Sequence, residues 1–278
     1  MKELFDHVSA ACSRRVTRAY SSSFSLGIYF LDKNLRAPIY AIYGFVRLAD
    51  EITDSFHAFD KRELLADFRR DTFKAIVAGI SLNPVLNSFQ KAVNRYQIDH
   101  ELIETFLGSM EMDLTRTSHD SLSLSKYIYG SAEAVGLMCL RVFCDGDEGL
   151  FRLLKEPAMR LGAAFQKVNF LRDLHADYHN LHRTYFPNLQ IGNFSDKKKV
   201  EIEAEIKADF RAALDGIKRL PAGARFGVYV AYVYYRALLR RIEATSGEML
   251  LRQRLRVPGH HKFALLLRSY FRYNLGGL

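Results

Sequence analysis

The sequence predicts an all-α protein, and three of its features carry that prediction. Apolar residues recur at helical spacing along most of the 278 residues, whereas no paired alternating segments indicate strands. Helix breakers are few, with 6 Pro and 17 Gly. The breaks between periodic segments are short, so about nine to eleven helices are expected.

Several helix starts are marked by their first residues. Asp60, followed by Glu63 at the third helical position, is typical of a helix N-terminus. Asp99 precedes an apolar stripe and can cap a second helix. Pro157 and Pro221 stand where a first helical turn tolerates proline. Further helical stretches are predicted over residues 123–143, 157–178, 197–217 and 221–242.

The chain is expected to form one domain over residues 1–278. No stretch rich in Pro, Gly or Ser resembles a linker. The expected breaks between helices are residues 32–34, 79–84, 115–121, 144–147, 186–194 and 244–248.

Composition narrows the class of protein. The net charge of +9 suits nucleic acid, anionic lipid or a polyanionic small substrate, but no basic cluster with interleaved aromatic residues supports nucleic-acid binding. The first 20 residues carry charges throughout and no run of about 18 apolar residues occurs, so neither a signal peptide nor a membrane span is expected. The sparse cysteines Cys12, Cys139 and Cys144 form no zinc pattern and suit a reducing cytoplasm, the expected location.

Two helical segments carry stripes of oxygen ligands. Asp50 and Asp54 are four residues apart, so they project from one helix face, which by itself most often means a solvated acidic edge. Asn169, Asp173 and Asp177 form a second stripe over two turns, in a segment that follows a run of apolar and small residues. Two such stripes in one helical chain predict a shared site rather than two solvated edges.

The chemistry of the stripes predicts a divalent cation and a phosphate-bearing substrate. Carboxylate and amide oxygens suit Mg²⁺, or Mn²⁺ in its place, and Mg²⁺ completes its shell with water and phosphate oxygens. Zinc would more often recruit Cys or His. Arg47, Arg172 and Arg183 could bind phosphate oxygens. Residues 20–24 offer hydroxyls and backbone N–H groups, although taken alone their serines are more often explained by a turn or an N-cap.

Together these residues resemble the squalene/phytoene synthase family, closest to its bacterial, phytoene-forming members. The resemblance runs from about Phe5 to Tyr273 and implies an isoprenoid-synthase-type helical bundle around a central cavity. Its motifs, in order, are Ser21–Ser25, Ile39–Arg47, Asp50–Asp54, Tyr127, Ala132–Gly136, Leu161–Asp177 and Arg183–Pro187. Two departures are His182, where the family often has glycine, and Glu51, where it usually has a second aspartate; Glu51 is expected off the ligand face.

The resemblance also implies residue roles. The implied Mg²⁺ ligands are Asp50 and Asp54 in the first set and Asn169, Asp173 and Asp177 in the second. Tyr235 is implied near the reacting centre, although the adjacent Tyr234 could take that place. The residues implied to hold diphosphate or the prenyl chain are Tyr20, Ser21, Ser22, Ser23, Phe24, Tyr43, Arg47, Tyr127, Gln166, Arg172, Arg183 and Tyr185.

The implied reaction is the Mg²⁺-dependent, head-to-head condensation of two prenyl diphosphates through a cyclopropylcarbinyl diphosphate. The resemblance favours geranylgeranyl diphosphate as substrate and phytoene, the first product of carotenoid biosynthesis. Farnesyl diphosphate, giving squalene or dehydrosqualene, and a non-catalytic scaffold are the alternatives. Cavity depth would decide the chain length, and its floor is not visible in the sequence.

The C-terminal stretch from Lys262 to Tyr273 is both basic and apolar. It fits an interfacial helix on a membrane surface, which would make the protein peripherally associated. It fits a last core-packing helix with a solvated basic face equally well.

Overall fold

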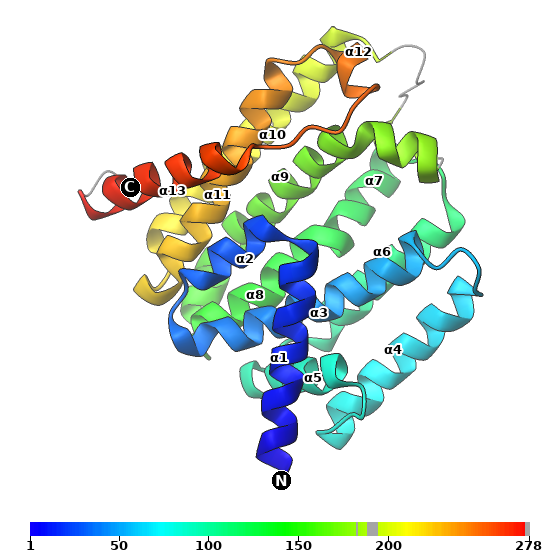
Figure 1. Ribbon diagram of the computed structural model, residues 1–278, viewed down its shortest axis with the longest axis vertical. Helices are drawn as coiled ribbons and strands as arrows, with labels where there is room; N and C mark the ends of the chain where they lie inside the picture. The colour runs from blue at the N-terminus through cyan, green and yellow to red at the C-terminus, as the bar shows by residue number, and fades with distance from the viewer. Residues whose placement is uncertain (182, 188–193, 276–278) are drawn as a thin grey trace.

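The computed structural model describes residues 1–181, 183–187 and 194–275, and these residues form the predicted all-α bundle (Figure 1). No strand occurs within those ranges, where Ser118 and Thr184 form one isolated bridge. His182 and most of the expected break 186–194 lie outside the described residues. The helices are α1 Lys2–Tyr20, α2 Ser22–Tyr29, α3 Lys33–Asp54, α4 Lys61–Ala78, α5 Pro84–Tyr96, α6 His100–Thr115, α7 Ser121–Ile128, the π-helix Tyr129–Glu133, α8 Ala134–Cys144, α9 Glu148–Leu181, α10 Asp196–Arg219, α11 Ala222–Glu243, α12 Gly247–Leu250 and α13 Gly259–Asn274.

The described ranges hold thirteen α-helical segments, which is more than the roughly nine to eleven expected. Ser21 alone separates α1 from α2; its hydroxyl accepts a hydrogen bond from the backbone N–H of Phe24, at 3.2 Å, as an N-cap. The expected helix 123–143 is divided by the π-helix, where Gly130 approaches α6 so closely that an added Cβ would lie 2.6 Å from the carbonyl oxygen of Thr105.

One expected cap is confirmed and the other is wrong. The Asp60 carboxylate accepts hydrogen bonds from the backbone N–H groups of Arg62 and Glu63. Asp99 does stand at the start of α6, but its side chain caps no backbone group. It accepts hydrogen bonds from the Arg141 guanidinium instead, at 3.0 and 3.1 Å, because a bidentate charged donor competes well against a neutral amide.

Pro157 does not begin a helix, contrary to the sequence prediction, because α9 starts at Glu148 and continues through it. An internal proline frees the carbonyl four residues earlier. Here that residue is Leu153, whose side chain is 53% exposed, so water can reach this turn. The proline ring packs against Gly216 of α10, where a Cβ would overlap it. The missing side chain at Gly216 therefore makes room for the ring.

Adding a methyl group at Gly216 is expected to destabilise the fold. In Gly216→Ala the new Cβ would collide with the Pro157 ring, at a cost of about 1–3 kcal/mol. Gly108→Ala, in the interior of α6 with no heavy atom within 4 Å of its new Cβ, should instead stabilise the protein by about 0.5–1 kcal/mol. Chemical denaturation of both variants tests this, and equal effects at the two positions would contradict it.

The buried apolar residues form two clusters, and the candidate site lies between them. One cluster includes Phe45 of α3, stacked on Phe89 of α5 with centroids 3.9 Å apart. The other is built mainly from α9, α10 and α11. Among the described residues, one helical stretch, Ser121–Cys144, is long and apolar enough to cross a membrane, but half of its apolar window is buried and it packs against α6 and α9. That is the position of a core helix.

Candidate active site

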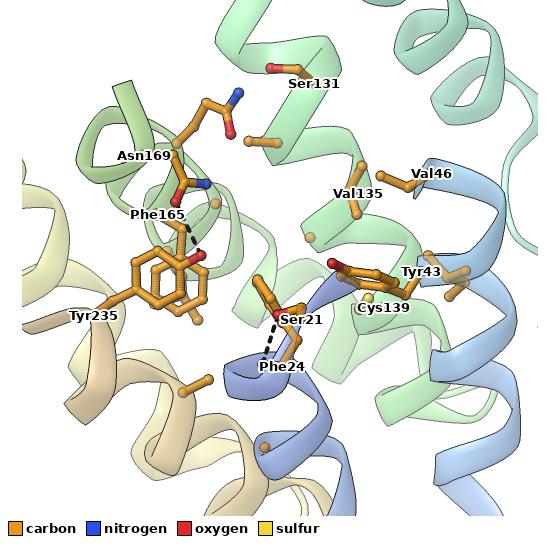
Figure 2. A pocket seen from close by; sticks show the side chains of 18 of the residues that line it. Ser21, Phe24, Tyr43, Val46, Ser131, Val135, Cys139, Phe165, Asn169 and Tyr235 are labelled. Atoms are coloured by element: carbon orange, nitrogen blue, oxygen red, sulfur yellow. Dashed lines mark hydrogen bonds between the residues drawn. The ribbon is translucent and has the colours of Figure 1, made fainter. Parts of the chain in front are cut away.

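A cavity of about 510 Å³ lies between α3, α8, α9 and α11, with α2 across one side (Figure 2). Most of the site residues predicted from the sequence line it. These are Tyr20, Ser21, Phe24, Tyr43, Arg47, Asp50, Asp54, Tyr127, Gln166, Asn169, Arg172, Asp173, Asp177, Tyr185 and Tyr235. Ser22, Ser23 and Arg183 lie outside its lining.

The first acidic stripe lies on the last two turns of α3. Burial raises the pKa of Asp50 to about 7, and the charge of Asp54 adds to this effect. Glu51 turns away from the stripe and forms a salt bridge with Arg47. The Arg47 guanidinium also lies 4.2 Å from the centre of the Tyr20 ring. Arg47 is thereby held at the edge of the stripe, where an anionic ligand could reach it.

The second stripe lies on α9 and faces the first. Burial raises the pKa of Asp177 to about 8, and the negative charges of Asp173 and Asp54 raise it further. Asp54 belongs to α3, so the two stripes are close enough to repel each other. Asp173 is held by Arg172, with Nε to Oδ1 at 2.9 Å, and by Arg254, with Nε to Oδ1 at 2.6 Å.

Asp113 and Arg254 complete this polar end of the cavity, and the sequence reasoning missed both. Asp113, on α6, is buried and accepts a hydrogen bond from the Tyr127 hydroxyl at 2.6 Å, while the Tyr185 hydroxyl lies 3.4 Å from its other oxygen. Arg183 is buried behind the stripe, where it binds Asp54 at 2.9 Å. It therefore positions a carboxylate of the site without lining the cavity.

The oxygen atoms at this end fit a hard divalent cation. Among the described residues no three His, Cys, Asp or Glu side chains converge closely enough to hold an ion by themselves. The donors are instead split between two helices, and Asp50 and Asp177 are partly buried without a described salt-bridge partner. Mg²⁺ needs only one or two carboxylates and completes its shell with water and phosphate. A cation between the stripes would relieve their mutual repulsion.

The buried carboxylates predict an unusual pH dependence of stability. The folded-state pKa values of Asp50 and Asp177, about 7 and about 8, lie above the usual 3.8, so the metal-free fold should lose stability as pH rises from about 4 to 8. We expect the melting temperature to fall by several degrees between pH 5.5 and 8, since about 1 kcal/mol corresponds to roughly 2–4 °C. Calorimetry with and without Mg²⁺ and inorganic pyrophosphate measures this; a metal-free melting temperature that rises over this range would contradict it.

Aromatic rings form the middle of the cavity. Phe165 stacks on Tyr235, with centroids 3.9 Å apart, and the ring of Phe24 lies within 6.0 Å of both (Figure 2). The hydroxyl of Tyr235 donates a hydrogen bond to Asn169 at 3.3 Å, which ties it to the second stripe. The neighbouring Tyr234 does not line the cavity and lies against Lys262, so of these two tyrosines it is Tyr235 that lines the site.

The far end of the cavity is apolar, and the structure identifies its floor. Ala158 and Leu154 lie 15 and 19 residues before Asp173 on α9, which is about 22 and 28 Å along the helix axis. Burial raises the pKa of the Cys139 thiol in the wall to about 12, so it remains neutral. The other residues of this end include Leu31, Ile39, Phe143, Pro157, Ala213, Gly216, Ile217, Leu220, Gly227 and Val228.

The bundle has the isoprenoid-synthase helical fold, since solved structures with that fold superpose on most of the chain. A dehydrosqualene synthase matches with a TM-score of 0.84 and 19% identity, covering 97% of this chain and 98% of its own. The squalene synthase HpnC from Alicyclobacillus acidocaldarius matches with a TM-score of 0.75 and 20% identity, covering 86% of this chain and 94% of its own.

The model of the squalene/phytoene synthase family matches residues 17–191, more than half of the chain, and the protein belongs to that family. A phytoene synthase of Arthrospira platensis is 27% identical over 91% of this chain and 89% of its own. A 15-cis-phytoene synthase of Synechocystis is 28% identical over 93% of this chain and 83% of its own. The chain spans 64% of the chloroplastic phytoene synthase 3 of Zea mays, at 28% identity.

Proposed function

We propose that this protein is a Mg²⁺-dependent prenyltransferase that joins two molecules of geranylgeranyl diphosphate head to head to give phytoene. One observation carries the proposal: two carboxylate-lined helices, α3 and α9, face each other at one end of a deep cavity whose other end is apolar. Such a cavity matches a substrate with a diphosphate head and a long hydrocarbon tail. The names of the relatives support phytoene as the product.

The polar end would bind and ionise the diphosphate. Asp50, Asp54, Asn169, Asp173 and Asp177 would hold Mg²⁺, which supplies positive charge for the leaving diphosphate. Arg47, Arg172 and Arg254 are the cationic residues, among those that the structure describes, that line the same cavity, and they would bind phosphate oxygens. The salt bridges of Asp173 with Arg172 and Arg254 would then be exchanged for bonds to the ligands.

The aromatic middle would protect and stabilise the allylic carbocation left when the diphosphate departs. The double bond of the second substrate would attack this cation, and loss of one proton would close the ring of a cyclopropylcarbinyl diphosphate. Departure of the second diphosphate, rearrangement of the resulting cation and loss of a second proton would give the linear hydrocarbon. The faces of Phe165, Tyr235 and Phe24 attract a cation electrostatically, and their packing excludes water that would quench it.

Product analysis tests the proposal. Purified protein is incubated with Mg²⁺ and either geranylgeranyl or farnesyl diphosphate. The hydrocarbon is then extracted, and its molecular mass is measured by mass spectrometry. A C40 product from the C20 substrate, abolished by EDTA, is expected. A C30 product from the C15 substrate alone would keep the mechanism but overturn the substrate choice. No product from either substrate would favour a non-catalytic scaffold.

A further inference from the structure

The last helix of the described chain, α13, has two chemically different faces. It runs along the outside of the bundle beside α11 and leads to the C-terminus (Figure 1). Its inward face is fixed by Ser269, which is 3% exposed, and by Tyr273, whose ring lies 5.0 Å from that of Phe226 in α11. This packing determines which residues of α13 point to the outside.

The outward face of α13 is apolar. Phe263, Leu267, Tyr270 and Phe271 are 63%, 43%, 52% and 60% exposed. Tyr270 forms the edge of this face, since its ring also lies 6.1 Å from that of Phe226. At about 100° per residue these four fall within roughly 100° of the helix circumference, so they form one continuous stripe. We call these four residues the α13 stripe. Scattered exposed apolar residues are ordinary on a protein surface, but a stripe of four with three aromatic rings usually marks an interaction site.

Positive charge borders the stripe. Arg268 and Arg272 lie one turn apart along one of its edges, and both are exposed. Glu248 is the last acidic residue of the sequence, whereas six Lys and Arg follow it. Positive charge therefore predominates around α13, and this surface attracts anions.

We propose that the α13 stripe docks on an anionic lipid bilayer, with α13 lying in the plane of the interface. An apolar stripe that enters the acyl region, bordered by arginines that remain at the headgroups, is the arrangement of an interfacial helix. Negative lipid headgroups complement the arginines over the whole length of the helix. The proposal does not depend on the catalytic role of the protein.

The start of α13 lies against α2, which forms one side of the cavity. At the start of α13 the ammonium group of Lys262 donates a hydrogen bond to the Ser22 hydroxyl at 2.8 Å. Ser22 directly follows Ser21, which lines the cavity. A bilayer on the α13 stripe would thus lie next to the α2 side of the cavity, where a long hydrocarbon would have a short path into the acyl region.

Vesicle sedimentation tests the proposal with the full-length protein. The vesicles are phosphatidylcholine alone or phosphatidylcholine with about one third phosphatidylglycerol. The variants are Phe263→Gln/Phe271→Gln in the stripe and Arg268→Gln/Arg272→Gln at its border. The control for the stripe variant is Val77→Gln/Leu82→Gln, on α4 and the following loop, where the two residues are 86% and 92% exposed. The control for the border variant is Arg62→Gln/Lys74→Gln, which removes two exposed cations from α4.

We expect the wild-type protein and both controls to bind anionic vesicles and to be released by salt. Each α13 variant should bind at least about tenfold more weakly, since two arginines or two buried rings each contribute that much. Circular dichroism and melting temperature should stay at wild-type values. Equal binding to neutral vesicles, unchanged binding of the α13 variants, or no vesicle binding at all would overturn the proposal. So would concentration-dependent dimerisation lost in the stripe variant, which would assign the stripe to a second copy of the chain.

Discussion

Replacing Asp50 with asparagine is expected to lower hydrocarbon formation by about 10²–10³-fold while making the metal-free protein more stable. The side chain would keep its shape but lose the charge that the proposed Mg²⁺ site requires, and losing one strong electrostatic contact to a transition state costs about 10²–10³-fold. Stability should rise because burial and Asp54 together disfavour the charged form of Asp50, whose pKa is raised to about 7. Kinetics at saturating Mg²⁺ and calorimetry at pH 8 measure the two effects.

The pairing of lost activity with gained stability makes this prediction specific. A variant that merely misfolded would lose both. Asp71→Asn removes an exposed carboxylate from α4 and should change neither quantity. If Asp50→Asn kept more than about a tenth of the wild-type rate, Asp50 could not be an essential metal ligand. If the variant melted at a lower temperature than the wild type at pH 8, the charge of Asp50 would not be destabilising the metal-free fold.

Filling the floor of the cavity is expected to change substrate preference. Ala158→Phe adds a ring to the lining, about 22 Å along α9 from Asp173, without touching the polar end. A single methylene group that no longer fits an apolar pocket is worth about 10–200-fold. We therefore expect kcat/KM for geranylgeranyl diphosphate to fall by about 10²-fold, and that for farnesyl diphosphate by less than about tenfold. Competition between the two substrates in one reaction gives the ratio directly.

The control for this variant adds the same ring where it cannot reach the cavity. Ala208 is exposed on α10, so Ala208→Phe should leave the ratio of the two substrates unchanged. An equal loss for both substrates in Ala158→Phe would mean that the far end does not hold the end of the tail. The melting temperature of each variant distinguishes a shortened cavity from a weakened core.

Helix content and most helix bounds could be predicted because apolar periodicity is a local property of the chain. The exceptions required partners from elsewhere in the fold. Asp99 fits a cap, but Arg141 from another helix binds its side chain. Pro157 fits a helix start, but Gly216 of α10 provides space for its ring inside a longer helix. Neither partner is visible in the neighbouring sequence.

The two acidic stripes were predictable for the same reason, since residues four apart share a helix face. Asp113 has no such partner on α6, and it joins the site only because Tyr127, Tyr185 and Arg183 converge on it in space. Arg254 lies in the irregular segment before α13 and reaches Asp173 across 81 residues. The cavity floor depends on packing between α8, α9 and α10, which no single segment encodes.

The π-helix Tyr129–Glu133 joins α7 and α8 into one continuous helix, but the side chains before and after it are rotated relative to each other about the helix axis. Its wider turn offsets the residues before it by about 100° from an unbroken α-helix, so that Tyr127 meets Asp113 while Val135 and Cys139 form the cavity wall. Removing one residue from this turn would restore a regular α-helix. The residues on one side of the deletion would then rotate about the helix axis, and different side chains would face the cavity. This wall should therefore accept many point substitutions during evolution and very few changes in length.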